Sequence, residues 1–191
     1  MPHIFYSERG YGMPELPEAE VVARQLHARL LGAQLTDVWI GREDIVREGY
    51  DTAPWYCGAT LQSVERFGKS VALGFVNSRA CRYVVAELGM TGLLLFQSAP
   101  TKHPQHVHAR LSFKGGHEPE LRYWNPRRFG RLSLLDKAGL DRYRTRRFGM
   151  DPLAASQQDF VRLLQERRGR LKTLLMHQQV IAGVGNIYAN E

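Results

Sequence analysis

The chain has 191 residues, of which 43% are hydrophobic, so it can bury a core in one large domain or two small ones. Lys and Arg number 26 against 19 acidic residues, and the net charge of +7 is compatible with a polyanionic partner such as nucleic acid. Neither Cys57 nor Cys81 belongs to a C-x-x-C pair, so we expect no disulfide framework or zinc ribbon in this stretch. No apolar run suits a membrane span or a signal peptide. We therefore expect a reduced, cytoplasmic compartment.

The first predicted element is a helix that starts at Leu16 and ends at Gly32. The residues before it, 1–12, are polar and aromatic without a period, and we interpret them as a tail. Pro17 suits a first helical turn, and the acidic Glu18 and Glu20 favour the positive end of the helix dipole. Apolar residues then recur every four positions, at Val22, Leu26 and Leu30.

The middle of the chain predicts a β-domain. Short apolar or alternating segments are separated by Gly, Pro, Asn or Ser, and Gly115-Gly116 marks a turn. Many short strands with turn signals are typical of a sandwich or barrel. The predicted strands are 35–41, 60–67, 70–76, 82–88, 92–97, 106–113, 119–124 and 128–135.

The C-terminal part predicts helices. Ser156 followed by Asp159 resembles a helix cap, a second helix is expected at 170–176, and a third is expected to start as the sequence stops at Glu191. The expected domains are therefore 13–150 and 151–191. Since the last helix has no C-terminal cap, we interpret the chain as truncated.

Two Pro-Glu pairs, Pro14-Glu15 and Pro17-Glu18, lead directly into the first helix. A proline at a chain N-terminus is a secondary amine that can attack an aldehyde carbon to form an iminium, and nearby carboxyls can transfer protons. Proline and acidic residues are also common at ordinary helix starts. These residues alone do not separate the two interpretations.

Residues in three later stretches can likewise be interpreted as functional or as purely structural. Lys69 in "RFGKSVALGF" suits a phosphate contact or a solvated turn. Met90 in "ELGMTG", with Arg127 and Phe129 in "NPRRFG", suits wedges that replace an extruded base, but such residues more often lie in a core or in solvent. Glycines in "GVGN" expose backbone N–H groups that favour an anion, yet helix starts are full of glycine.

Taken together, "MPELPEAE", "GKS", "ELGMTG", "NPRRFG" and "GVGNIYANE" resemble, in this order, the formamidopyrimidine-DNA glycosylase family, the Fpg/Nei group of base-excision repair enzymes. The resemblance runs from Met13 to Glu191 and favours the Fpg branch. It implies an α+β fold, with an N-terminal helix on a two-layer β-sandwich of about eight strands, followed by a partial helix-two-turn-helix region. It also implies a monomer that removes oxidised purines such as 8-oxoguanine and formamidopyrimidines from double-stranded DNA and cleaves the abasic strand.

The resemblance assigns roles to individual residues. Pro14 matches the nucleophile, Glu15 the acid that assists opening of the deoxyribose, and Glu18 a supporting carboxylate. Lys69 matches a hairpin lysine at the lesion and its phosphate. The DNA-contacting residues implied are Met90, Arg127 and Phe129, which fill the duplex after base extrusion, Lys172 and Asn186, which bind phosphate, and His106.

Three residues depart from the family pattern. Glu87 and His177 stand where His and Asp, respectively, are usual, and Asn125 stands for the Asp of "DPRRFG". We expect these changes to weaken phosphate contacts or loop rigidity, Glu87 by adding negative charge near DNA. The resemblance implies no metal or cofactor in this chain. It places one zinc ion in a C-terminal zinc finger beyond Glu191, along with the loop that covers the extruded base.

The nitrogen of Pro14 leaves an alternative open. If Met13 acylates it, the nitrogen is an amide and is not a nucleophile. We expect translation to start at Met13, followed by removal of that methionine. The alternative is a non-catalytic DNA-binding paralogue or fragment, and a basic β-module unrelated to repair remains only if the motifs match by accident.

Overall fold

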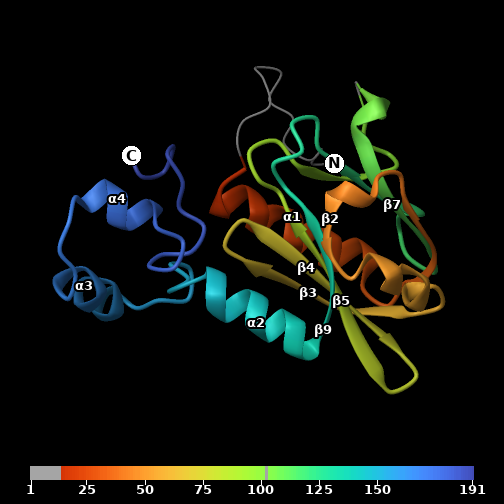
Figure 1. Cartoon of the computed structure of the whole chain (residues 1–191), viewed down its shortest axis with the longest axis horizontal. Helices are drawn as coiled ribbons and strands as arrows, with labels where there is room; N and C mark the ends of the chain where they lie inside the picture. The colour runs from red at the N-terminus through yellow and green to blue at the C-terminus, as the bar shows by residue number, and fades with distance from the viewer. Residues whose placement is uncertain (1–13, 102) are drawn as a thin grey trace.

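The computed structural model describes residues 14–101 and 103–191, and its fold is α+β (Figure 1). Helix α1, Leu16–Leu30, begins with Pro17 in its first turn and the acidic Glu18 near its positive end, as the sequence predicts. Its periodic leucines, Leu26 and Leu30, are buried against the sheet.

A nine-stranded sheet follows, in the order β2-β9-β5-β4-β3-β1-β7-β8-β6. Neighbouring strands are antiparallel except for the parallel pair β2 and β9. The sequence did not predict β2, which has only three residues and no room for a period. The strands are β1 Gln34–Ile40, β2 Val46–Glu48, β3 Thr60–Phe67, β4 Ser70–Asn77, β5 Ala80–Glu87, β6 Leu93–Phe96, β7 Val107–Lys114, β8 Glu120–Trp124 and β9 Leu132–Asp136. Short 3-10 turns lie at Glu43–Ile45, Tyr50–Tyr56 and Pro104–His106.

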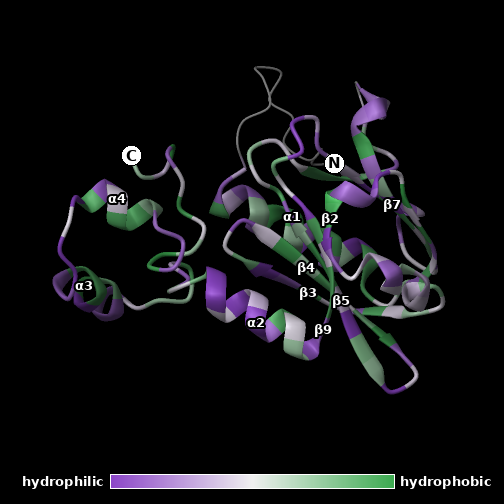
Figure 2. Cartoon of the chain, in the orientation of Figure 1, coloured by the Kyte–Doolittle hydropathy of each residue, from purple (hydrophilic) through white to green (hydrophobic). Residues whose placement is uncertain are grey.

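The two halves of this sheet face each other across one core. Phe75 on β4 and Phe113 on β7 stack with ring centroids 6.4 Å apart, although β3 and β1 separate their strands in the sheet. Leu35, Leu61 and Leu121 from both halves are buried in the same cluster. The sheet therefore folds into the two layers that the sequence predicts, and hydrophobic residues alternate with polar ones along several strands (Figure 2).

Helix α2, Lys137–Arg147, was not predicted. The side chain of Asp136 caps it by accepting a hydrogen bond from the backbone N–H of Gly139 at 2.7 Å. It buries little beyond Leu140 and Tyr143, so it lacks the apolar repeat that marks a helix in a sequence, and much of it is hydrophilic (Figure 2).

Helices α3, Gln157–Gln165, and α4, Leu171–Met176, lie to one side of the sheet (Figure 1). Ser156 and Asp159 form the expected capping box at the start of α3. The third helix expected near the end is wrong for the described chain: residues 186–190 form turns, with one i to i−4 hydrogen bond from Ala189 to Gly185. Within the described ranges no helix is both long and apolar enough to cross a membrane.

Candidate active site

A pocket of about 180 Å³ lies where four distant segments meet. Pro14 and Glu15 come from the start of α1, Lys69 from the β3–β4 turn, Met90 from the β5–β6 loop and Asn186 from the segment after α4. The structure thus brings together five of the ten residues that the motifs singled out. The remaining lining residues are Gly89, Met176, Gln178, Val184 and Gly185.

Glu15 joins the start of α1 to the last residues of the chain. Its carboxylate is 1% exposed and accepts backbone N–H bonds from Gly185 at 2.7 Å, Ile187 at 2.9 Å and Tyr188 at 3.3 Å. A carboxylate that accepts several backbone bonds is held in one position. The backbone N–H of Glu15 is in turn fixed by the carboxylate of Glu18, at 2.9 Å.

Lys69 faces this carboxylate from the β3–β4 turn. Gly68 allows the turn with φ +55°. Burial lowers the pKa of the Lys69 ammonium, while the negative charges of Glu15 and Glu18 partly oppose the change. Lys69 is therefore a cation that loses its proton more readily than an exposed lysine does.

Two pocket residues without an assigned role hold the loop opposite Glu15. Gln178 donates to the carbonyl of Val184 at 2.8 Å and accepts from the N–H of Gly183 at 2.9 Å, so it fixes the "GVG" turn. Gly185 packs so closely that a Cβ there would overlap both the Glu15 carboxylate and Lys69 Nζ. Sequence reasoning did not single out Gln178, because its partners lie in an irregular loop.

The loops that carry the predicted wedges lie against each other. Met90 and Phe129 are 36% and 55% exposed, and the guanidinium of Arg127 stacks 5.0 Å from the centroid of the Phe129 ring. A Cβ on Gly89 would strike the backbone of Gly130, so the loops touch directly behind these side chains. Exposed apolar tips on a fixed base suit insertion into a base stack.

Asn125 holds its loop through both ends of its amide. Its side chain is fully buried, and its Oδ1 accepts the backbone N–H of Arg128 at 2.9 Å, which supports the left-handed conformation of Arg128 at φ +53°. Its Nδ2 donates to the hydroxyl of Tyr123 at 3.0 Å and to the carbonyl of Gly130 at 3.3 Å. An aspartate cannot make the last bond when ionised.

Glu87 is paired within the protein, so the charge we expected near DNA is largely offset. Its carboxylate is bound by Arg147 at 2.7 Å and Arg47 at 3.0 Å. Its carbonyl oxygen accepts the hydroxyl of Tyr123 at 2.7 Å. Glu87 and Asn125, two of the residues that depart from the family pattern, are therefore both hydrogen-bonded to the hydroxyl of Tyr123.

The other predicted residues lie outside the pocket lining. Glu18 is exposed and receives a 3.3 Å hydrogen bond from the Tyr188 hydroxyl. The carbonyl of His106 accepts the N–H of Asn125 at 2.9 Å, which places it at the base of the wedge loop. Lys172 lies on exposed α4 and bonds Asn190 at 2.7 Å. His177 is exposed, and its carbonyl accepts the N–H groups of Val180 and Ile181.

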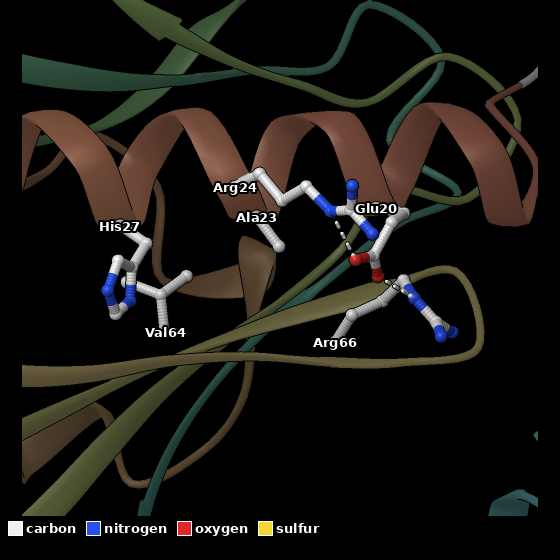
Figure 3. Close-up of a pocket in the computed structure, with 6 residues that line it drawn as sticks. All are labelled: Glu20, Ala23, Arg24, His27, Val64 and Arg66. Atoms are coloured by element: carbon white, nitrogen blue, oxygen red, sulfur yellow. Dashed lines mark hydrogen bonds and ion pairs between the residues drawn. The ribbon is translucent and has the colours of Figure 1, made fainter. Parts of the chain in front are cut away.

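A larger hollow of about 380 Å³ lies between α1 and β3 (Figure 3). It is lined by an ion-pair network: Glu20 pairs with Arg24 at 2.8 Å and with Arg66 at 2.7 Å. None of the ten residues with an assigned role lines it. We therefore place the candidate site in the smaller pocket, where those residues converge.

The described residues do not fit a zinc ion. Zinc sites in proteins use clusters of Cys, His and carboxylate ligands. Across 14–101 and 103–191, no group of three or more such side chains stands close enough to hold a metal.

Comparison with known proteins assigns the family. Residues 13–132 match the model of the formamidopyrimidine-DNA glycosylase N-terminal domain, and residues 148–191 match that of the formamidopyrimidine-DNA glycosylase H2TH domain. Proteins named formamidopyrimidine-DNA glycosylase from Herpetosiphon aurantiacus and Thermomicrobium roseum are 34% and 35% identical over 94% of this chain. The chain belongs to the formamidopyrimidine-DNA glycosylase family.

Solved structures agree with this assignment. The MutM (Fpg) protein from Thermus thermophilus is 34% identical with a TM-score of 0.74, and the match covers 93% of this chain and 62% of that one. A Lactococcus lactis Fpg in complex with abasic-site DNA is 27% identical with a TM-score of 0.75, and the match covers 93% of this chain and 66% of that one. The chain spans 65% and 66% of the two relatives named above.

Proposed function

We propose that this protein is a DNA glycosylase and abasic-site lyase that removes oxidised purines, such as 8-oxoguanine and formamidopyrimidines, from double-stranded DNA. The observation that carries the proposal is the pocket shared by Pro14, Glu15, Lys69 and Asn186, which come from three separate motifs. The active form begins at Pro14, because only then is its nitrogen an amine.

In the proposed reaction, the nitrogen of Pro14 attacks C1′ of the damaged nucleotide. The bond from C1′ to the base breaks, and the base leaves with a proton. Glu15 protonates the deoxyribose oxygen as the ring opens, and the nitrogen and C1′ become an iminium. Loss of a proton from C2′ then expels the 3′ phosphate, and a second elimination expels the 5′ phosphate.

The remaining residues act on the DNA itself. Lys69, Lys172 and Asn186 are proposed to hold phosphates, with His106 beside the wedge loop. Met90, Arg127 and Phe129 would fill the space left by the extruded base. We propose that residues 13–150 form the catalytic domain and 151–191 part of the DNA-binding domain of a monomer that acts in the cytoplasm.

The proposal is tested by trapping the iminium. Full-length protein beginning at Pro14 is incubated with abasic or 8-oxoguanine DNA and reduced with borohydride. We expect a covalent adduct, and peptide mapping should place it on Pro14. An adduct on Lys69 would overturn the role of Pro14.

A second candidate function is DNA binding without catalysis. The observation that favours it is that the sequence joins Pro14 to Met13, whose carbonyl would remove the amine. Nicking of 8-oxoguanine duplex is compared for proteins beginning at Met1 and at Pro14. Activity confined to the Pro14 form supports the enzyme, binding without nicking by both forms supports the second candidate, and nicking by an intact Met1 form refutes the mechanism.

A further inference from the structure

Glu87, Arg47 and Arg147 form a charge cluster outside the pocket, at the base of both wedge loops. Glu87 is the last residue of β5, three positions before Met90. Its carbonyl oxygen lies so close to Gly130 that a Cβ there would overlap it. Arg47 comes from β2 and Arg147 from the end of α2, so three separate elements meet at one carboxylate.

The two arginines are more exposed than the glutamate, so an anion in solvent can reach their guanidiniums. Glu87 is 13% exposed, while Arg47 and Arg147 are 47% and 36% exposed. The carboxylate therefore lies beneath two guanidiniums that reach solvent, and the cluster has a net charge of +1. Each guanidinium has five N–H donors, and the bond to Glu87 uses one of them.

Arg147 is also held in place by an aromatic ring. The guanidinium of Arg147 lies 4.7 Å from the centroid of the Tyr143 ring, and the Tyr143 hydroxyl is hydrogen-bonded to Ser70, next to Lys69, at 2.9 Å. A guanidinium fixed by a carboxylate and an aromatic ring loses less freedom when it binds a second anion.

We propose that Arg47 and Arg147, oriented by Glu87, bind backbone phosphates of DNA beside the Met90 loop. This inference rests on the proposed function, because it takes DNA as the partner. Duplex DNA that receives Met90 and Phe129 would carry one phosphate charge per about 1.7 Å of its axis, so phosphates are the anions that two solvent-exposed arginines beside these loops would meet. Glu87 thus orients two cations, whereas by itself it would repel DNA.

The test measures how DNA affinity depends on salt, in the full-length protein beginning at Pro14. Glu87→Gln is the background, since its amide oxygen can still accept a bond from a guanidinium, while no carboxylate is stranded when the arginines are removed. Adding Arg47→Gln and Arg147→Gln should reduce the slope of log K against log salt concentration by about 1.8, or 0.9 per phosphate contact. Affinity is measured on a short duplex with a reduced abasic site.

The matched control removes two charges elsewhere in the same background, by Arg79→Gln and Lys114→Gln. Both residues are exposed, and they lie at the opposite ends of β5 and β7 from the wedge loops. This control should leave the slope almost unchanged. An equal slope change in both variants, or none in either, would overturn the phosphate contact. Borohydride trapping of the unaltered protein reports separately on the proposed function.

Discussion

At the scale of single residues, Glu15 is both a candidate proton donor and the acceptor that holds the end of the chain. The same carboxylate binds three backbone N–H groups at residues 185–188. These bonds leave its position fixed relative to Pro14, its neighbour in the chain. A single substitution can separate the chemical role from the structural one.

Glu15→Gln removes the proton but keeps one oxygen as an acceptor. We expect base excision by the full-length protein to fall by about 10²–10⁴, because a positioned acid is lost. Duplex affinity should stay within a few-fold. Single-turnover excision and equilibrium binding are measured together. A loss of affinity as large as the loss of rate would show that Glu15 only supports the fold.

Asn125→Asp restores the residue usual in the family but removes the amide donor. Since position 125 is fully buried, the ionised carboxylate would face the carbonyl of Gly130 without a hydrogen bond. We expect the free energy of unfolding to fall by about 1–3 kcal/mol at neutral pH. Urea denaturation measures this. Unchanged stability would mean that the loop rearranges around the carboxylate.

At the scale of elements, the pocket depends on how closely the segment 183–188 approaches α1 and the β3–β4 turn. Leu16 donates its N–H to the carbonyl of Gly183 at 3.0 Å, and Gly185 lies against Glu15 and Lys69. There is no space for a side chain at this contact. A methyl group is therefore a direct probe of the packing.

Gly185→Ala should displace Glu15 or Lys69 and reduce excision by at least about 10²-fold, as a small misplacement of catalytic groups does. Gly32→Ala is the control. A side chain at Gly32 is disfavoured only by the backbone conformation, with φ +81°. Nothing lies within 4 Å of its Cβ position. The control should lose stability by about 1 kcal/mol and keep its excision rate. Full activity of Gly185→Ala would refute the close contact.

The sequence predicted the elements that have an apolar period or a cap, and five of its ten candidate site residues line one pocket. It predicted α1 from its leucine spacing and α3 from Ser156 and Asp159. It missed α2, which shows no apolar stripe, and it did not predict that Arg47 and Arg147 bind Glu87, because they lie 40 and 60 positions away. Long-range pairs of charges leave no local pattern.

At the scale of the whole molecule, Arg66 connects the β-domain to the C-terminal segment. Its side chain is 6% exposed and pairs with Glu20 on α1 at 2.7 Å and with Asp151 at 2.6 Å. It also donates to the carbonyl of Gly68, beside Lys69, at 3.3 Å. One guanidinium thus links three segments around the pocket.

Arg66→Met should lower the free energy of unfolding by about 1–3 kcal/mol, because two partly buried carboxylates lose their partner. Arg24→Met is the matched control: Arg24 also pairs with Glu20, but its side chain is 76% exposed, so we expect a change of about 0.5 kcal/mol or less. Urea midpoints compare the two variants. Equal losses in the free energy of unfolding would show that burial of the Arg66 network adds nothing to its contribution to stability.

The same network predicts a dependence on pH. The hydrogen bond from Arg66 is the main cause that lowers the pKa of Glu20 below its usual value of 4.5. A lowered folded-state pKa gives stability that is present above pH 4.5 and is lost as the pH falls through the folded value. Unfolding at a series of acidic pH values should show this loss, and Arg66→Met should reduce it.

The bond between Glu15 and Gly185 joins residues 170 positions apart. During synthesis the ribosome releases α1 and the sheet long before it releases residues 185–188. Until then the carboxylate of Glu15 has none of these three N–H partners, and the pocket lacks one wall. We therefore expect the site to be completed last, so that the pocket of a nascent chain stays open on this side until residues 185–188 have left the ribosome.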